Sequence, residues 1–157
     1  MLSLKQGLSI ESSSLRSTWT PKDEATLEAW YQKAIGITIT GSGVSLWADS
    51  SGKGVDMAQA TDSERPAYAN GVLTFDDNNT QSLQSSGQVS LEGDFTIGAR
   101  LKVTTSGGVL LGDNTTSGEF IRFSTNTQFR VRIDNTTAVN IEKNEGNWLE
   151  DAYMVLV

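Results

Sequence analysis

The chain has 157 residues, enough for one domain with a substantial core, and its formal net charge is −7. It contains neither cysteine nor histidine, which excludes disulfides, thiol chemistry, Ser-His triads and histidine metal ligands. Because the charge is negative and lysine and arginine form no cluster, a nucleic-acid partner is not expected. No apolar run approaches the roughly 20 residues of a membrane-spanning helix, so membrane insertion is not expected either.

Residues 1–20 form a leader rich in serine and threonine. Its apolar residues are separated by polar ones, and they are Leu2, Leu4, Leu8, Ile10 and Leu15. Serine-rich segments bury little apolar surface, which favours a flexible arm. The alternation equally suits an extended segment that pairs with a sheet edge or a neighbouring subunit. The sequence therefore predicts an N-terminal arm over 1–20, either flexible or used for assembly, followed by one domain over 21–157.

The segment from Pro21 to Ala34 allows two interpretations. Leu27, Trp30, Tyr31 and Ala34 recur at helical spacing, which predicts a short helix or helical turn. The alternative, implied by a family resemblance given below, is a short extended segment over Leu27–Tyr31 that packs Trp30 into the core.

Beyond residue 36, short apolar runs separated by turn residues predict strands. The expected strands are 37–40, 44–47, 72–75, 95–103, 108–111, 120–124, 129–133, 139–141 and 153–157. Apolar and polar residues alternate most clearly in 95–103. This pattern is typical of an all-β antiparallel sandwich. Because the last strand stops without a turn or a polar tail, we expect the native protein to extend beyond Val157, so that 21–157 is an incomplete domain.

A longer motif begins before the first expected strand and continues past the second. Its residues are Leu27, Trp30 and Tyr31; Gly36, Ile37 and Thr38; Val44, Ser45, Trp47, Asp49, Ser51, Gly52 and Gly54; Gln59, Ala60 and Thr61; Arg65 and Pro66; and Phe75 and Asp76. The order and spacing resemble the laminin-G-like branch of the concanavalin A-like lectin/glucanase superfamily, in the form found in tailed bacteriophage virion proteins. The resemblance covers roughly residues 27–157. The chain departs from the family where Phe75-Asp76 is followed by Asp77 instead of glycine.

The resemblance implies a two-sheet antiparallel jelly-roll sandwich and a non-enzymatic structural role in a virion, as a capsid decoration or a tail or fibre component. It implies that the N-terminal arm contacts other virion proteins, and a homo-oligomer is expected. The alternative is a carbohydrate-binding adhesion module that recognises host or environmental glycans. Glucanases of this superfamily carry carboxylates as Glu-x-Asp-x-x-Glu on one strand, and this chain has no such run. We therefore expect no catalytic residues and no enzymatic activity.

Two acidic loops are candidate calcium sites, although no cofactor is required by the expected role. Calcium prefers several oxygen ligands on a folded loop, and the candidates are Asp49, Ser51 and Asp56, and then Asp76 and Asp77. Lys53 argues against the first set because its ammonium group would lie among the ligands. In the alternative interpretation, Asp49 and Ser51 cap backbone N–H groups while Gly52 and Gly54 adopt positive φ.

Two tryptophans are candidate glycan platforms. Sugars stack on exposed rings, and Trp19 and Trp148 are the indoles that the resemblance does not place in the core. Trp30 and Trp47 are expected to be core residues.

Overall fold

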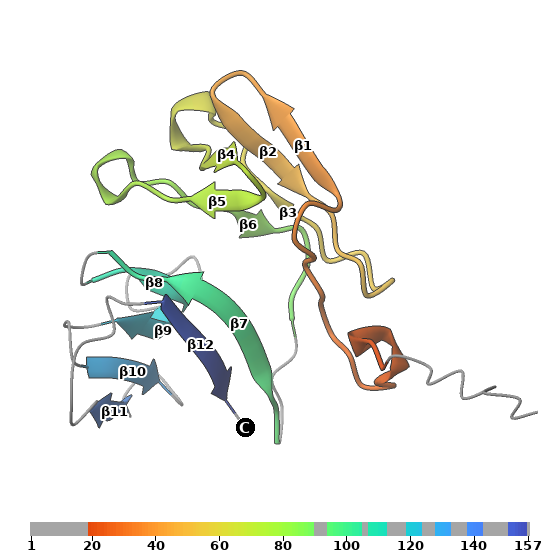
Figure 1. Cartoon of the computed structure of the whole chain (residues 1–157), viewed down its shortest axis with the longest axis vertical. Coiled ribbons are helices and arrows are strands. Elements are labelled where there is room, and N and C mark those ends of the chain that lie inside the picture. Colours follow the sequence, from red (N-terminus) through yellow and green to blue (C-terminus); the bar gives the residue numbers. More distant parts are fainter. Residues whose placement is uncertain are drawn as a thin grey trace, which may run out of the picture. The chain divides into compact units, whose positions relative to one another are not determined.

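The computed structural model describes residues 19–89, 94–104, 107–112, 119–123, 128–132, 138–142 and 151–156. The chain divides into two compact units, Met1–Val89 and Ser90–Val157, whose strands are labelled in Figure 1. Within the described ranges, the regular elements are strands and single turns of 3-10 helix, so the predicted all-β class is confirmed. None of the helices described is long and apolar enough to cross a membrane. Residues 1–18 of the predicted arm, with Leu2, Leu4, Leu8, Ile10 and Leu15, lie outside the described residues, as do Trp148 and Val157.

The first unit contains a four-stranded sheet and a separate hairpin. The sheet has the order β1-β2-β3-β6, and the hairpin pairs β4 with β5. The strands are β1 Ile37–Thr40, β2 Gly43–Trp47, β3 Met57–Ala58, β4 Ala67–Ala69, β5 Val72–Thr74 and β6 Gln84–Ser85. The described part of this unit also has three single turns of 3-10 helix: η1 Pro21–Asp23 before β1, η2 Asp62–Glu64 between β3 and β4, and η3 Asp77–Asn79 between β5 and β6.

The turn between β4 and β5 is set by its two central residues. Asn70 has φ 54° and Gly71 has φ 78°, and positive φ at both positions is what a two-residue hairpin turn requires. Asn70 and Gly71 therefore close the β4–β5 hairpin with the turn that an Asn-Gly pair favours.

The helix predicted over 21–34 is wrong beyond its first turn. A capping box between Thr20 and Asp23 starts η1, but Glu24 already has extended backbone angles. Ala34 adopts φ 62°, which is incompatible with a right-handed helix. The backbone between them bonds to the loop after β2 instead, because the N–H of Ser50 donates to the carbonyl of Trp30 at 2.7 Å. Residues 27–31, which the alternative makes extended, belong to no helix or strand, and Trp30 is partly buried.

In the described part of the second unit, the strands form two antiparallel groups. One is a four-stranded sheet in the order β11-β10-β9-β8, and the other pairs β12 with β7. Their bounds are β7 Ile97–Lys102, β8 Val109–Gly112, β9 Glu119–Phe123, β10 Gln128–Arg132, β11 Ala138–Glu142 and β12 Asp151–Leu156. Ile121, Phe123 and Phe129 form its buried core, and Ile97 and Leu101 of β7 pack against them. Alternate residues of β7 are partly buried and exposed, as the period-two pattern predicts.

Candidate functional site

The loop after β2 is organised by one carboxylate. Oδ1 of Asp49 accepts hydrogen bonds from the backbone N–H of Trp30 at 2.9 Å and of Ser51 at 2.8 Å. Oδ2 accepts from the hydroxyl of Ser51 and from the N–H of Gly54 at 3.1 Å and of Val55 at 3.3 Å. The side chain of Asp49 therefore binds the backbone of the segment before β1 and the backbone at both ends of its own loop.

These hydrogen bonds control the ionisation of Asp49. Partial burial alone would raise the pKa of its carboxyl group, but donors that include the hydroxyl and N–H of Ser51 stabilise the charged form and lower the pKa to about 2. The neighbouring Tyr31 shifts the other way, because burial and the charges of Asp49 and Asp56 raise its pKa to about 12. Its hydroxyl donates a hydrogen bond to the carbonyl of Val55. At physiological pH, Asp49 is therefore charged and Tyr31, beside the loop, is neutral.

The other predicted ligands of this loop also bind the backbone. Asp56 accepts a hydrogen bond of 2.8 Å from the N–H of Asp49, and the hydroxyl of Ser51 accepts one of 3.1 Å from the N–H of Lys53. Gly52 and Gly54 have φ of 96° and 74°. The structure thus brings Asp49, Ser51 and Asp56 together in the geometry of the capping interpretation. Calcium at this loop stays a prediction, which titration calorimetry with calcium chloride tests directly.

The second acidic candidate is a cap on η3. Asp76 accepts hydrogen bonds from the N–H of Asn78 at 3.0 Å and from the side-chain amide of Asn79 at 2.7 Å. Hydrogen bonds from the backbone and side chain of Asn78 are the main cause that lowers the pKa of Asp76. Asp77 is the first residue of η3. Among the residues that the structure describes, no group of three or more acidic residues is arranged to hold a metal ion.

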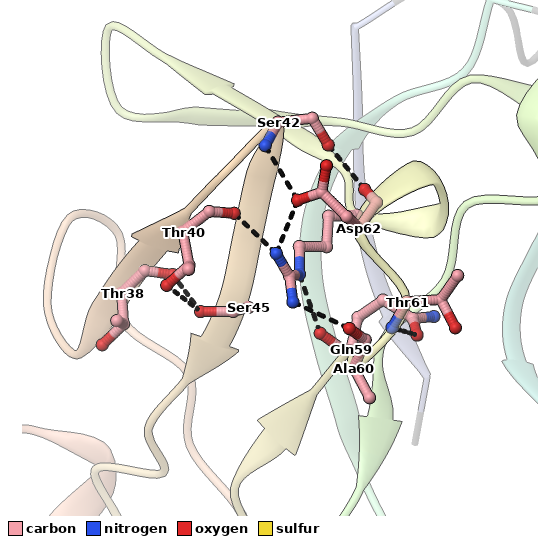
Figure 2. Close-up of polar contacts among 9 residues, drawn as sticks. Thr38, Thr40, Ser42, Ser45, Gln59, Ala60, Thr61 and Asp62 are labelled. Carbon is pink, nitrogen blue, oxygen red and sulfur yellow. Dashed lines mark hydrogen bonds and ion pairs between the residues drawn. The ribbon is translucent and has the colours of Figure 1, made fainter.

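A third polar cluster was not predicted and centres on Arg65. Its guanidinium group donates to the carbonyls of Thr40 at 2.7 Å, Gln59 at 3.0 Å and Ala60 at 2.8 Å, and it contacts Asp62 at 2.6 Å. The Arg65 side chain is 12% exposed. Figure 2 shows the acceptors converging from the end of β1 and from the loop between β3 and η2.

Neighbouring contacts extend this cluster. Asp62 also accepts from the N–H of Ser42 at 3.0 Å, and the Ser42 hydroxyl donates to the Asp62 carbonyl (Figure 2). Gln59 is 7% exposed, and its amide donates to the carbonyl of Ser82. In the sequence, Gln59 and Arg65 stood out only as parts of the family resemblance. The cluster joins the β1–β2 turn to η2.

The tryptophans differ in exposure. The Trp19 side chain is 69% exposed, while Trp30 and Trp47 are partly buried. The Trp47 indole N–H donates to the carbonyl of Gln32 at 3.1 Å, and its ring lies 5.5 Å from that of Tyr31. Trp19 is thus the candidate glycan platform that the described residues include.

Comparisons with known proteins found no matching family model, no matching curated protein and no matching solved structure.

Proposed function

We propose that this chain is a non-enzymatic structural protein of a bacteriophage virion, built on a concanavalin A-like jelly-roll sandwich. It acts as a capsid decoration or as a tail or fibre component, and it contacts other virion proteins through residues 1–20. The proposal starts from the motif that runs from Leu27 to Asp76 and its resemblance to laminin-G-like virion proteins. The all-β architecture is consistent with it.

One observation carries the non-enzymatic part of the proposal. The polar residues of the motif bind the protein's own backbone: Asp49 accepts from four backbone N–H groups, and Arg65 donates to three carbonyls. Side chains that hold the backbone in this way stabilise loops, whereas catalytic carboxylates must face a substrate. The motif therefore supports a scaffold that presents surfaces for assembly.

Purified particles of the phage that encodes the chain provide the test. We expect mass spectrometry to detect the chain in particles that survive density-gradient centrifugation, and antibody labelling to place it on the capsid or the tail. A chain found only in the soluble fraction of the lysate would contradict the proposal. Measurable release of reducing sugar from polysaccharides would contradict its non-enzymatic part.

A carbohydrate-binding module is the second candidate, and the exposure of Trp19 favours it. A ring that is 69% exposed is available for stacking on a sugar. A glycan array probed with the full chain and with Trp19→Ala tests this function. Phe75→Ala is the matched control, because Phe75 is also an exposed aromatic residue, at 51%. Binding that is lost in Trp19→Ala and kept in the control would support the module, and an array without reproducible binding would exclude it for the glycans presented.

A further inference from the structure

β1 is an edge strand of the first unit. It ends the order β1-β2-β3-β6 and pairs with β2 on one side, and no other described strand pairs with its second side (Figure 1). An edge strand presents backbone N–H and C=O groups that a further strand can pair with. The geometry of the sheet therefore leaves one side of β1 available as an acceptor.

The composition of β1 does little to block such pairing. Proteins usually protect edges with charged residues, proline or very short strands, but β1 reads Ile-Thr-Ile-Thr over 37–40. Ile39 on this strand is 55% exposed, and the nearby Ile35 is 52% exposed. The opposite edge, β6, has only two residues. A register shift between Thr38 and Ile39 limits the regular stretch on β1, so an added strand would be held reversibly.

The N-terminal segment has the pattern of a strand that would fit this edge. Leu2 and Leu4, and then Leu8 and Ile10, alternate with polar residues, which places apolar side chains on one face of an extended chain. Residues 1–10 contain one basic residue, Lys5, and no acidic residue. Residues 19–89 contain nine acidic and four basic residues. The charge of the segment therefore complements that of the unit carrying β1.

We propose that residues 2–10 of a second copy add to the free side of β1 as an extra strand. The inference rests on the proposed structural role, because assembly of a particle requires contacts between copies. Backbone hydrogen bonds provide the affinity, and apolar side chains of the segment cover Ile39. Since each copy carries one donor segment and one acceptor edge, two copies can exchange segments in a closed dimer, and longer series of copies build rings or fibres.

Two variants of the full chain separate donor from acceptor. Leu4→Asp places a charge on the apolar face of the donor, and Ile39→Lys places one on the acceptor edge. We expect each variant to be monomeric in light scattering at concentrations where the unmodified chain associates. Val72→Lys is the matched control, because Val72 is also 55% exposed and lies on β5 of the same unit. Association that survives both variants, or that is lost equally in the control, would overturn the proposal.

Cysteine pairing tests the contact without disrupting it, because the chain has no cysteine of its own. Chains that carry one substitution each, Leu2→Cys, Leu4→Cys or Leu8→Cys, are mixed with Ile39→Cys chains and oxidised. We expect a mixed disulfide between the two different chains, identified by the mass of the linked peptides, from at least one donor position, and none when Val72→Cys replaces Ile39→Cys. Absence of the mixed disulfide from all mixtures, or its formation to the same extent with Val72→Cys, would overturn the proposal. A chain present in particles but monomeric in these tests would keep the proposed function and refute the strand exchange.

Discussion

The carboxylate of Asp49 accepts a hydrogen bond of 2.9 Å from the backbone N–H of Trp30, nineteen residues earlier in the chain. This bond joins the irregular segment before β1 to the loop after β2. A second hydrogen bond joins the same two segments, because the carbonyl of Trp30 accepts from the N–H of Ser50 at 2.7 Å. A partly buried backbone segment without regular structure needs such partners, because unpaired N–H and C=O groups are costly away from water. Asp49 therefore has a structural function, whatever else the loop binds.

Replacing Asp49 tests that function. Asp49→Asn keeps the size of the side chain but removes its charge and turns one acceptor oxygen into a donor that faces backbone N–H groups. Since water reaches part of the loop, we expect the free energy of unfolding to fall by about 1 to 2 kcal/mol. Equilibrium denaturation in urea measures the change. Asp76→Asn is the control, and it should have a smaller effect because that turn is exposed; an equal loss in both variants would contradict the special role of Asp49.

We expect acid to lower the free energy of unfolding by protonating Asp49. The folded pKa of Asp49 is lowered from 3.8 to about 2, so its ionised form contributes stability that is fully present above pH 3.8. That contribution is lost as the pH falls from 3.8 towards 2. We expect the difference in stability between the unmodified chain and Asp49→Asn to shrink over this range. Urea midpoints measured at pH 6, 4, 3 and 2 would show it, and a difference that stays constant down to pH 2 would refute the assignment.

Arg65 should tolerate no conservative replacement. Lysine keeps the charge but lacks the planar fork that reaches the carbonyls of Thr40, Gln59 and Ala60 together. Because the side chain is only 12% exposed, we expect Arg65→Lys to lower the free energy of unfolding by about 2 to 3 kcal/mol in urea denaturation. Lys53→Gln is the control. The ion pair between Lys53 and Glu28 is long, at 3.9 Å, and exposed. Its loss should lower the free energy of unfolding by under about 1 kcal/mol.

The sequence predicted the strands well where an apolar pattern marks them. All nine expected strands are present, with ends within two residues of those expected, and β1 has the predicted bounds of Ile37–Thr40. Three strands were missed, namely β3, β4 and β6. Each has two or three residues, which is too short for alternation to be visible. Their pairing depends on neighbours such as Trp47, which lies opposite Met57, and not on their own composition.

The segment over 21–34 was ambiguous for a related reason. Trp30 and Tyr31 fit a helical period, but their partners lie beyond the segment: Asp49 receives the N–H of Trp30, and Val55 receives the hydroxyl of Tyr31. Contacts of this kind override local periodicity. The Arg65 cluster could not be predicted either, because its acceptors are backbone carbonyls, and any residue type supplies those. By contrast, the capping role of Asp49 and Ser51 followed from the spacing of Asp, Ser and Gly residues in one loop.

Gly43 is a position where an added methyl group should be harmful. A Cβ there would lie 2.5 Å from the carbonyl oxygen of Pro66 and 2.9 Å from that of Arg65. The close approach exists because the N–H of Val44 donates to the Pro66 carbonyl at 2.9 Å. We expect Gly43→Ala to lower the free energy of unfolding by about 1 to 3 kcal/mol. Gly98→Ala on β7 is the control, since nothing lies within 4 Å of its added Cβ; a comparable loss there would show that the clash is not the cause.

The core of the second unit should respond to the removal of single methyl groups. Ile121 is fully buried and belongs to one cluster with Phe123 and Phe129, whose rings lie 5.3 Å apart. Ile121→Val should cost about 1 kcal/mol and Ile121→Ala about 2 to 5 kcal/mol, because the larger deletion leaves a cavity beside two rigid rings. Val109→Ala is the control on the paired strand β8, where the side chain is 51% exposed and the change should stay within about 0.5 kcal/mol. Hydrogen exchange of the β9 and β10 amides gives the local readout. We expect these amides to exchange faster in Ile121→Ala and at an unchanged rate in Val109→Ala. Equal effects of the two variants would show that Ile121 does not anchor this core.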